Sequence, residues 1–332
     1  MMTLSSLLDK LNFAAPGGRW QLVELGDLWL VPRFVYHDLQ DNFAAAWIRQ
    51  NAIVQTQSPA ALAAEVIYEH IKELNIDDQP WRIIDICSGS GRLASHIESS
   101  INSKRRTAKR QPIPFQLSDL QPNAQLDAWM YQASLSKNLT FIPQAVDPAR
   151  PPFAAISSTT RGDKEAALRQ GYESNGTQVY RLMSSFHRFD DNKAVAILRS
   201  TLQTADAFTI IELQERRIFS FIFVVLENCM CFLFSVFWFR GDVIHLFFTY
   251  VVPVLPVLQR LDRIVSCIRT RSNEETIVLL ERAAGHTRRQ YSSLQGIESV
   301  IVNDWKITQR RRLHTWPIGY MTIVTGHKSP RQ

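Results

Sequence analysis

Residues 82–92 contain a run whose residue types could hold a charged small molecule. The run begins with β-branched apolar residues that alternate little with polar ones, as in a parallel strand covered on both faces: Ile83, Ile84 and Ile86. A turn of small residues follows, in which Gly89 and Gly91 allow a ligand to approach the backbone closely. The next residues, from Leu93, predict a helix whose free N–H groups point at the turn. Such a strand, turn and helix indicate a nucleotide site, but the third glycine of an NAD-binding loop is missing.

The turn resembles motif I of the class I S-adenosylmethionine (SAM)-dependent methyltransferases. Asp85, Gly89 and Gly91 match that motif, while Cys87 stands where its first glycine usually lies. The resemblance implies that Asp85 orders the loop and binds the methionine part of SAM, and that the turn contributes mainly backbone contacts. The turn residues implied to contact SAM are Cys87, Ser88, Gly89, Ser90 and Gly91.

Further landmarks of the same family follow in the expected order. Phe115–Leu120 resembles the second strand, whose acidic end, Asp119 followed by Leu120, is implied to hold the ribose hydroxyls. Phe141–Asp147 resembles a third strand, with Asp147 near the adenine. Tyr180–Asp190 resembles the fourth strand and its end, which places Ser185 at the cofactor. A helix over Asn192–Gln203 and a strand over Ala207–Leu213 complete the series.

Methyl transfer asks for an aligned nucleophile, exclusion of water and, for oxygen or nitrogen acceptors, removal of a proton. His187, at the carboxyl end of the fourth strand, is the candidate base, and the alternative is that it only shapes the pocket. Glu212 ends the fifth strand, where a hydrogen-bonding role is favoured over catalysis. Glu24 and Asp27 either reach the cleft or cap a helix. No metal is expected.

Nearly the whole chain resembles a group of fungal and bacterial methyltransferase-like proteins with an apolar C-terminal insertion. The segments that carry this resemblance are Trp20–Trp29, Phe247–Pro253, Leu261–Thr270 and Trp316–Tyr320. The fold implied is α/β: a Rossmann-like, seven-stranded methyltransferase sheet with a helical N-terminal lid and an apolar helical insertion before the last strands.

Composition agrees with a globular chain and argues against nucleic-acid binding. The 332 residues have a formal net charge of +6. The basic residues cluster without interleaved aromatic ones, so we expect solvated loops and no nucleic-acid partner. The four cysteines form neither a metal nor a disulfide framework, and no cleavable signal peptide is visible. We therefore expect a reducing, cytoplasmic location.

The pattern predicts four segments. Residues 1–79 form the lid, which ends in a helix that Ser58 caps and Pro59 begins. Residues 80–215 form the SAM-binding core, with loops near 102–112 and 155–178. Residues 216–272 form the apolar insertion. Residues 273–332 contribute a helix near 274–287 and closing strands near 300–308 and 320–326.

The apolar insertion leaves two readings open. Ile218–Phe239 is long enough to cross a bilayer and contains Glu227 as its only charge, and Val243–Leu258 adds a second apolar run. Ser220, Glu227, Cys231 and Ser235 fall on one helical stripe, which must face protein, a cavity or a partner helix. Residues 218–258 are therefore either a membrane-associated hairpin or a buried helix pair that encloses a lipophilic substrate.

These observations favour SAM-dependent methyl transfer to a small lipophilic molecule, in specialised (secondary) metabolism. One alternative is a methyltransferase fold that catalyses cyclisation or isomerisation of a lipophilic intermediate. A second alternative is a catalytically silent, membrane-tethered binding protein.

Overall fold

A computed structural model describes residues 8, 10–25, 28, 31, 33–74, 80–152, 177–285, 289–294 and 297–328. The chain divides into two compact units. The sheet unit comprises Pro59–Glu212, Asn273–Arg312 and Thr322–Gln332, and the helical unit comprises Met1–Ser58, Leu213–Ser272 and Leu313–Met321. The predicted four-segment division remains a prediction, although the helix assigned to the lid, α3 (Pro59–Glu73), belongs to the sheet unit.

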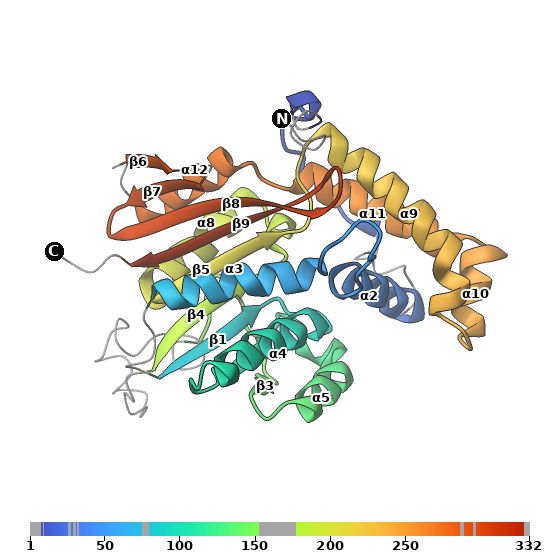
Figure 1. Cartoon of the computed structure of the whole chain (residues 1–332), viewed down its shortest axis with the longest axis horizontal. Coiled ribbons are helices and arrows are strands. Elements are labelled where there is room, and N and C mark those ends of the chain that lie inside the picture. The colour runs from blue at the N-terminus through green and yellow to red at the C-terminus, as the bar shows by residue number, and fades with distance from the viewer. Residues whose placement is uncertain are drawn as a thin grey trace. The chain divides into compact units, whose positions relative to one another are not determined.

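The described strands form one sheet in the order β3-β2-β1-β4-β5-β9-β8-β7-β6 (Figure 1). Their bounds are β1 Trp81–Ile86, β2 Phe115–Ser118, β3 Leu139–Phe141, β4 Gln178–Met183, β5 Ala207–Glu212, β6 Arg289–Leu294, β7 Ile297–Val302, β8 Trp305–Thr315 and β9 Gly319–Lys328. The first five strands pair in parallel, and β9 lies antiparallel to β5. The predicted Rossmann-like α/β class is thus confirmed.

Helices cover both faces of this sheet (Figure 1). Their bounds in the sheet unit are α3 Pro59–Glu73, α4 Arg92–Thr107, α5 Leu126–Leu135, α8 Asp191–Thr204 and α12 Asn273–Ala284, with short 3-10 turns η3 Pro122–Ala124 and η4 Phe186–Arg188. α3 packs on α4, and α8 packs on α12. β1 is buried on both faces, with Ile83 and Ile84 almost completely enclosed, as its apolar pattern predicted. A strand buried in this way holds the turn that follows it in a fixed place.

Three predictions on the sheet need correction. The described residues form nine strands where seven were expected, because β6 and β7 extend the antiparallel edge. The single strand expected near 300–308 is a hairpin that turns at Asn303, which has a left-handed φ of 55°. The third strand ends at Phe141 and does not reach Asp147, since Pro143 cannot donate to the ladder.

The basic loop expected at 102–112 is also wrong in part, since α4 continues to Thr107. Buried polar side chains stabilise that extension. The Asn102 amide donates to the Ile113 carbonyl at 2.9 Å and accepts from its N–H at 2.8 Å, and Arg105 Nε donates to the Gln111 carbonyl at 2.6 Å. Because these side chains are polar, the sequence pattern assigned Asn102 and Arg105 to a loop. The other expected loop, near 155–178, lies largely outside the described residues.

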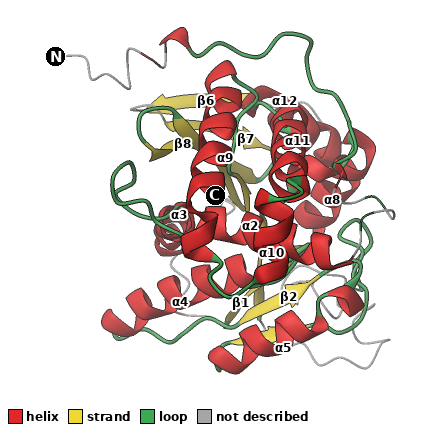
Figure 2. Cartoon of the chain, turned by 90° about the vertical axis from the view of Figure 1, so that its right-hand side faces the viewer, coloured by secondary structure: helices red, strands yellow, loops and turns green. Residues whose placement is uncertain are grey.

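The helical unit contains α2 Arg33–Ile48, α9 Ile218–Trp238, α10 Val243–Tyr250 and α11 Val254–Arg269. α9 lies beside α11, and α10 and α2 also contact α11 (Figures 1 and 2). In the described part of the chain, no single helix has the length and apolar character to cross a bilayer. Two bent pairs meet those criteria together: Ile218–Met230 with Phe232–Trp238, bent by 44°, and Val243–Tyr250 with Val254–Arg269, bent by 73°.

Candidate functional site

The turn between β1 and α4 is built from left-handed residues. Cys87, Gly89 and Gly91 have φ values of 61°, 50° and 72°. Gly91 is the N-cap of α4, and its N–H donates to the Ser88 carbonyl at 2.9 Å. Cys87 adopts this conformation with a side chain, which costs about 1 kcal/mol relative to glycine. The turn therefore reverses the chain tightly and leaves the start of α4 directed at the carboxyl end of the sheet.

Besides its left-handed φ, the position of Gly91 lacks space for a side chain. A Cβ atom at this position would lie 2.6 Å from Leu117 Cδ1 and 3.1 Å from Trp129 Cδ1. The Trp129 indole N–H also donates to the Gly89 carbonyl at 2.7 Å, and Trp129 itself is completely buried. Sequence reasoning missed Trp129, because its partner lies 40 positions earlier in the chain.

Two serines fasten the turn to the end of β2. The Ser88 N–H donates to the Ser118 carbonyl at 3.0 Å, and the Ser118 N–H donates to Ser88 Oγ at 3.1 Å. Both hydroxyls donate to the Asp85 carbonyl, at 3.0 Å from Ser88 and 2.8 Å from Ser118. The ends of β1 and β2 are consequently locked together, and Ser118 is a second residue that the sequence did not single out. Ser90 is half-buried between the two glycines.

The two carboxylates at these strand ends have different surroundings. Asp119 is partly exposed: its Oδ1 accepts the Gln121 N–H at 3.0 Å and its Oδ2 accepts the Gly89 N–H at 3.3 Å. Asp85 is buried, and within the described residues its Oδ1 has no hydrogen-bond partner. Burial, with a smaller contribution from the charge of Asp119, raises the pKa of Asp85 to about 7. Asp119 is placed to accept hydroxyls, and Asp85 is placed to receive a cation.

The remaining predicted cofactor residues lie at neighbouring strand ends. The Val146 N–H donates to the Asp119 carbonyl at 2.9 Å, which brings Asp147 to the end of β2 although it is not in a strand. Leu120 is exposed next to Asp119. Ser185 follows β4, whose Met183 is in register with Ile86 of β1. In open α/β sheets, ligands bind at such carboxyl ends, at the point where the strand order reverses, here between β1 and β4.

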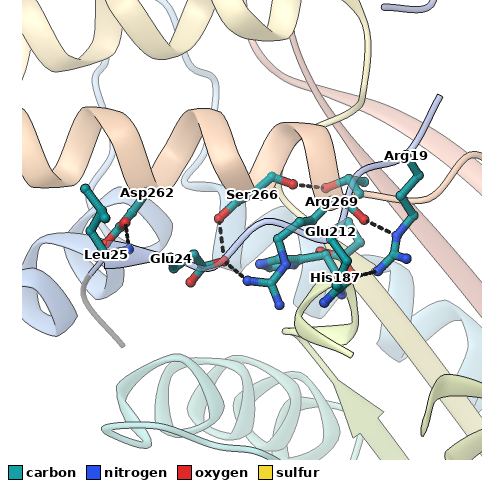
Figure 3. Close-up of polar contacts among 10 residues, drawn as sticks. Arg19, Glu24, Leu25, His187, Glu212, Asp262, Ser266 and Arg269 are labelled. Atoms are coloured by element: carbon teal, nitrogen blue, oxygen red, sulfur yellow. Dashed lines mark hydrogen bonds and ion pairs between the residues drawn. The ribbon is translucent and has the colours of Figure 1, made fainter. Parts of the chain in front are cut away.

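His187 and Glu212 form a buried pair (Figure 3). His187 Nδ1 lies 2.6 Å from Glu212 Oε2, and the His187 backbone N–H donates to Glu212 Oε1 at 2.7 Å. The Glu212 carboxylate thus forms hydrogen bonds with both the ring and the backbone of His187. When Nδ1–H donates to Glu212, Nε2 is the nitrogen that can take a proton. The hydrogen-bonding role predicted for Glu212 is confirmed, but its partner was not foreseen.

Other candidate groups have structural explanations. Burial raises the pKa of the Cys87 thiol to about 12, which suppresses its reactivity. Glu24 Oε1 accepts from Ser266 Oγ at 3.0 Å and from Arg269 Nη1 at 3.3 Å within the helical unit (Figure 3). Asp27 lies outside the described residues. Among the residues that the structure describes, no group of His, Cys, Asp and Glu side chains could hold a metal ion.

The landmarks quoted from the sequence now lie on β1, β2, β4 and β5 in order, followed by an antiparallel edge. A small-residue turn after β1 and an acidic residue after β2 stand at adjacent strand ends. This arrangement of strands is similar to that of the class I SAM-dependent methyltransferases. Within the described residues, the sheet carries two strands, β6 and β7, beyond the seven that this resemblance implies.

Comparisons with known proteins return structural neighbours only. No family model matches the sequence, and no curated protein matches it. Solved structures similar to this chain include an O-methyltransferase family protein from Burkholderia thailandensis, with 12% identity, 90% of this chain and 63% of that chain covered, and a TM-score of 0.39. Magnesium protoporphyrin IX methyltransferase from Synechocystis PCC 6803 has 10% identity, 89% and 95% coverage and a TM-score of 0.41. A SAM-dependent methyltransferase from Aquifex aeolicus has 12% identity, 89% and 98% coverage and a TM-score of 0.41.

Proposed function

We propose that this chain binds SAM at the carboxyl ends of β1, β2 and β4 and transfers its methyl group to a small lipophilic molecule. The observation that carries the proposal is the turn of residues 87–91, held by Trp129 beside the partly exposed carboxylate of Asp119. In line with the resemblance to fungal and bacterial methyltransferase-like proteins, we place the substrate in specialised metabolism. No feature of the described residues favours the cyclisation or the silent-binding alternative over transfer.

The donor groups suit SAM. Each oxygen of Asp119 accepts one N–H and retains a lone pair, so the carboxylate can take both ribose hydroxyls. The buried Oδ1 of Asp85, which lacks a partner among the described residues, would accept from the ammonium of the methionine part. That contact would lower the raised pKa of Asp85 and bind the ligand more tightly.

SAM supplies an activated methyl group, so the side chains need only orient the acceptor, exclude water and remove a proton. His187 is assigned to proton removal through Nε2, and Glu212 is a positioning residue that selects the ring tautomer. Glu212 also stabilises the imidazolium that forms when His187 takes the proton. The apolar composition of residues 218–258 supports a lipophilic acceptor.

Cofactor binding is tested by Asp119→Ala with calorimetry. Loss of an acceptor for two hydroxyls should weaken SAM affinity by about 1.5 to 3 kcal/mol, roughly ten- to a hundredfold. Asp127→Ala, which removes an exposed acid at the start of α5, is the matched control and should bind SAM normally. Equal affinity in the two variants would remove the cofactor site from the end of β2.

Transfer is tested by His187→Gln and Glu212→Gln, with release of demethylated cofactor measured over a panel of lipophilic alcohols, phenols and amines. His187→Gln should lower turnover on the order of a hundredfold while SAM affinity stays constant. Glu212→Gln should shift the acidic limb of the pH profile to lower pH, because a neutral amide stabilises the imidazolium less than a carboxylate. Unchanged turnover in His187→Gln would restrict His187 to shaping the pocket.

A further inference from the structure

α9 differs from a surface helix of a protein surrounded by water, because it buries polar residues and exposes apolar ones. Leu226, Leu233 and Phe237 are 54%, 57% and 57% exposed. The exposed apolar residues of α9 also include Ile222, Val225, Met230, Phe232, Phe234, Val236 and Trp238. Ser220 and Ser235 are buried, as the predicted polar stripe requires, whereas the side chain of Cys231 lies outside the described residues. The outer face of α9 is therefore continuously apolar.

The inward polar groups of α9 are matched by partners on α11. Glu227 forms an ion pair with Arg263, whose side chain is 8% exposed. Asn228 is buried next to Arg260. When its amide nitrogen is oriented to donate to the Pro256 carbonyl, its oxygen accepts from Arg260 Nη2 at 3.0 Å. A helix that pairs its charges inward and presents leucine and phenylalanine outward is arranged for apolar surroundings.

α10 and the first half of α11 extend the same surface. α10 packs on both α9 and α11, and the Tyr250 hydroxyl donates to the Phe232 carbonyl at 2.6 Å. The exposed apolar residues added here are Val243, Ile244, Phe247, Val251, Val252, Val254, Val257 and Leu261. We name the exposed apolar residues of α9, α10 and α11 the apolar face.

Charge at the edge of the apolar face selects among possible occupants. Arg240, in the turn between α9 and α10, is exposed and holds its guanidinium 5.6 Å from the Phe237 ring centroid. The carboxylates of residues 218–258 are Glu227, paired with Arg263, and Asp242, whose side chain caps α10 by accepting the His245 N–H at 2.9 Å. Aromatic rings and an arginine beside an apolar face match the interface of a bilayer that contains anionic lipid.

We propose that the apolar face is a monotopic docking surface for an anionic lipid bilayer, into which α9 and α10 insert without crossing. The bends of 44° in α9 and 73° between α10 and α11 agree with helices that lie in the interface. This proposal is independent of methyl transfer, since it rests on no residue of the cofactor site.

The test is flotation of the full chain with phosphatidylcholine vesicles that contain or lack phosphatidylglycerol. The wild type should float with the vesicles and remain bound in high salt, because apolar burial is not screened. Leu226→Ser/Leu233→Ser/Phe237→Ser should reduce binding roughly tenfold or more. Arg240→Gln should weaken only the preference for phosphatidylglycerol.

A matched control substitutes exposed apolar residues outside the apolar face: Met130, Tyr131 and Leu135 of α5, each changed to Ser. This variant should float like the wild type. SAM affinity and near-UV circular dichroism, measured on every variant, separate lost docking from lost folding and from failure of the proposed function.

Insertion can also be detected at Cys229, which is an exposed residue of α9. An environment-sensitive fluorophore attached there, with the other cysteines replaced by serine, should shift its emission to the blue on addition of vesicles. Wild-type protein that stays unbound to both kinds of vesicle overturns the proposal. Equally, dimers that the triple serine variant of α9 dissociates, without vesicle binding, would assign the apolar face to a second copy of the chain.

Discussion

β1 and α9 bury opposite kinds of side chain. β1 encloses Ile83 and Ile84 and leaves polar groups at its carboxyl end, as expected for a strand in the core of a protein surrounded by water. α9 encloses Ser220, Asn228 and Ser235 and exposes leucine and phenylalanine. The comparison shows that apolar content alone does not identify a core, because the partners of the polar minority decide which face of an element turns inward.

The largest expected effect compares equal truncations in the two regions. Ile84→Ala should lower the free energy of unfolding by about 2 to 5 kcal/mol, because Ile84 is 0% exposed and its removal leaves a cavity. Leu233→Ala should change it by about 0.5 kcal/mol or less, since Leu233 is already exposed. Denaturant unfolding in aqueous buffer measures both. A similar cost for the two variants would mean that the outer face of α9 is covered in solution.

Within α9, we expect the largest loss of unfolding free energy at the charged residue, Glu227. Glu227→Ala leaves Arg263 buried without its carboxylate and should cost about 3 kcal/mol, whereas Leu226→Ala at the adjacent exposed position should cost little. Replacing both Glu227 and Arg263 with leucine should restore most of the loss, because no charge then remains buried. Unfolding of the two single variants and the double variant completes the measurement, and a double variant as unstable as Glu227→Ala would contradict the pairing.

In the sheet unit, the corresponding sensitive position is the turn. Gly91→Ala combines an unfavourable φ of 72° with the contact to Leu117 and should cost about 2 to 3 kcal/mol. Gly285→Ala has a similar φ of 77°, and no atom of the described residues lies within 4 Å of the added Cβ, so it should cost about 1 kcal/mol from the backbone alone. Thermal unfolding separates the two terms. If the two variants were equally stable, the space at Gly91 would not be limiting.

The smallest expected effect is a pH dependence at Asp85. Its pKa in the folded chain, about 7, lies above its unfolded value of 3.8, so the folded state retains the proton longer. The associated stabilisation is complete below about pH 4 and is lost as the pH rises toward 7. In the wild type, the free energy of unfolding should therefore fall between about pH 5 and pH 7. In Asp85→Asn this fall should be smaller by about 1 to 2 kcal/mol, as measured by unfolding without SAM. Parallel pH profiles for the two proteins would show that Asp85 is ionised throughout.

Local pattern was enough to predict most of the elements around the proposed cofactor site. The run of isoleucines predicted β1, Pro59 predicted the start of α3, and the acidic end of β2 marked Asp119. Each of these signals lies within a few residues of the feature it predicts. Polar side chains that are tied to distant backbone, such as Asn102 in α4, gave no such signal and were assigned to a loop.

The sequence by itself determined the α/β class, the glycine turn with its nearby carboxylates, and the presence of a long apolar helix with a polar stripe. Only the tertiary structure decided that Glu212 forms a hydrogen bond with His187, because the two side chains are brought together by the pairing of β4 with β5. It likewise decided that the polar stripe of α9 turns inward, since helical periodicity defines two faces but leaves their direction to the partner helix. Arg263, 36 positions after Glu227, supplies that partner.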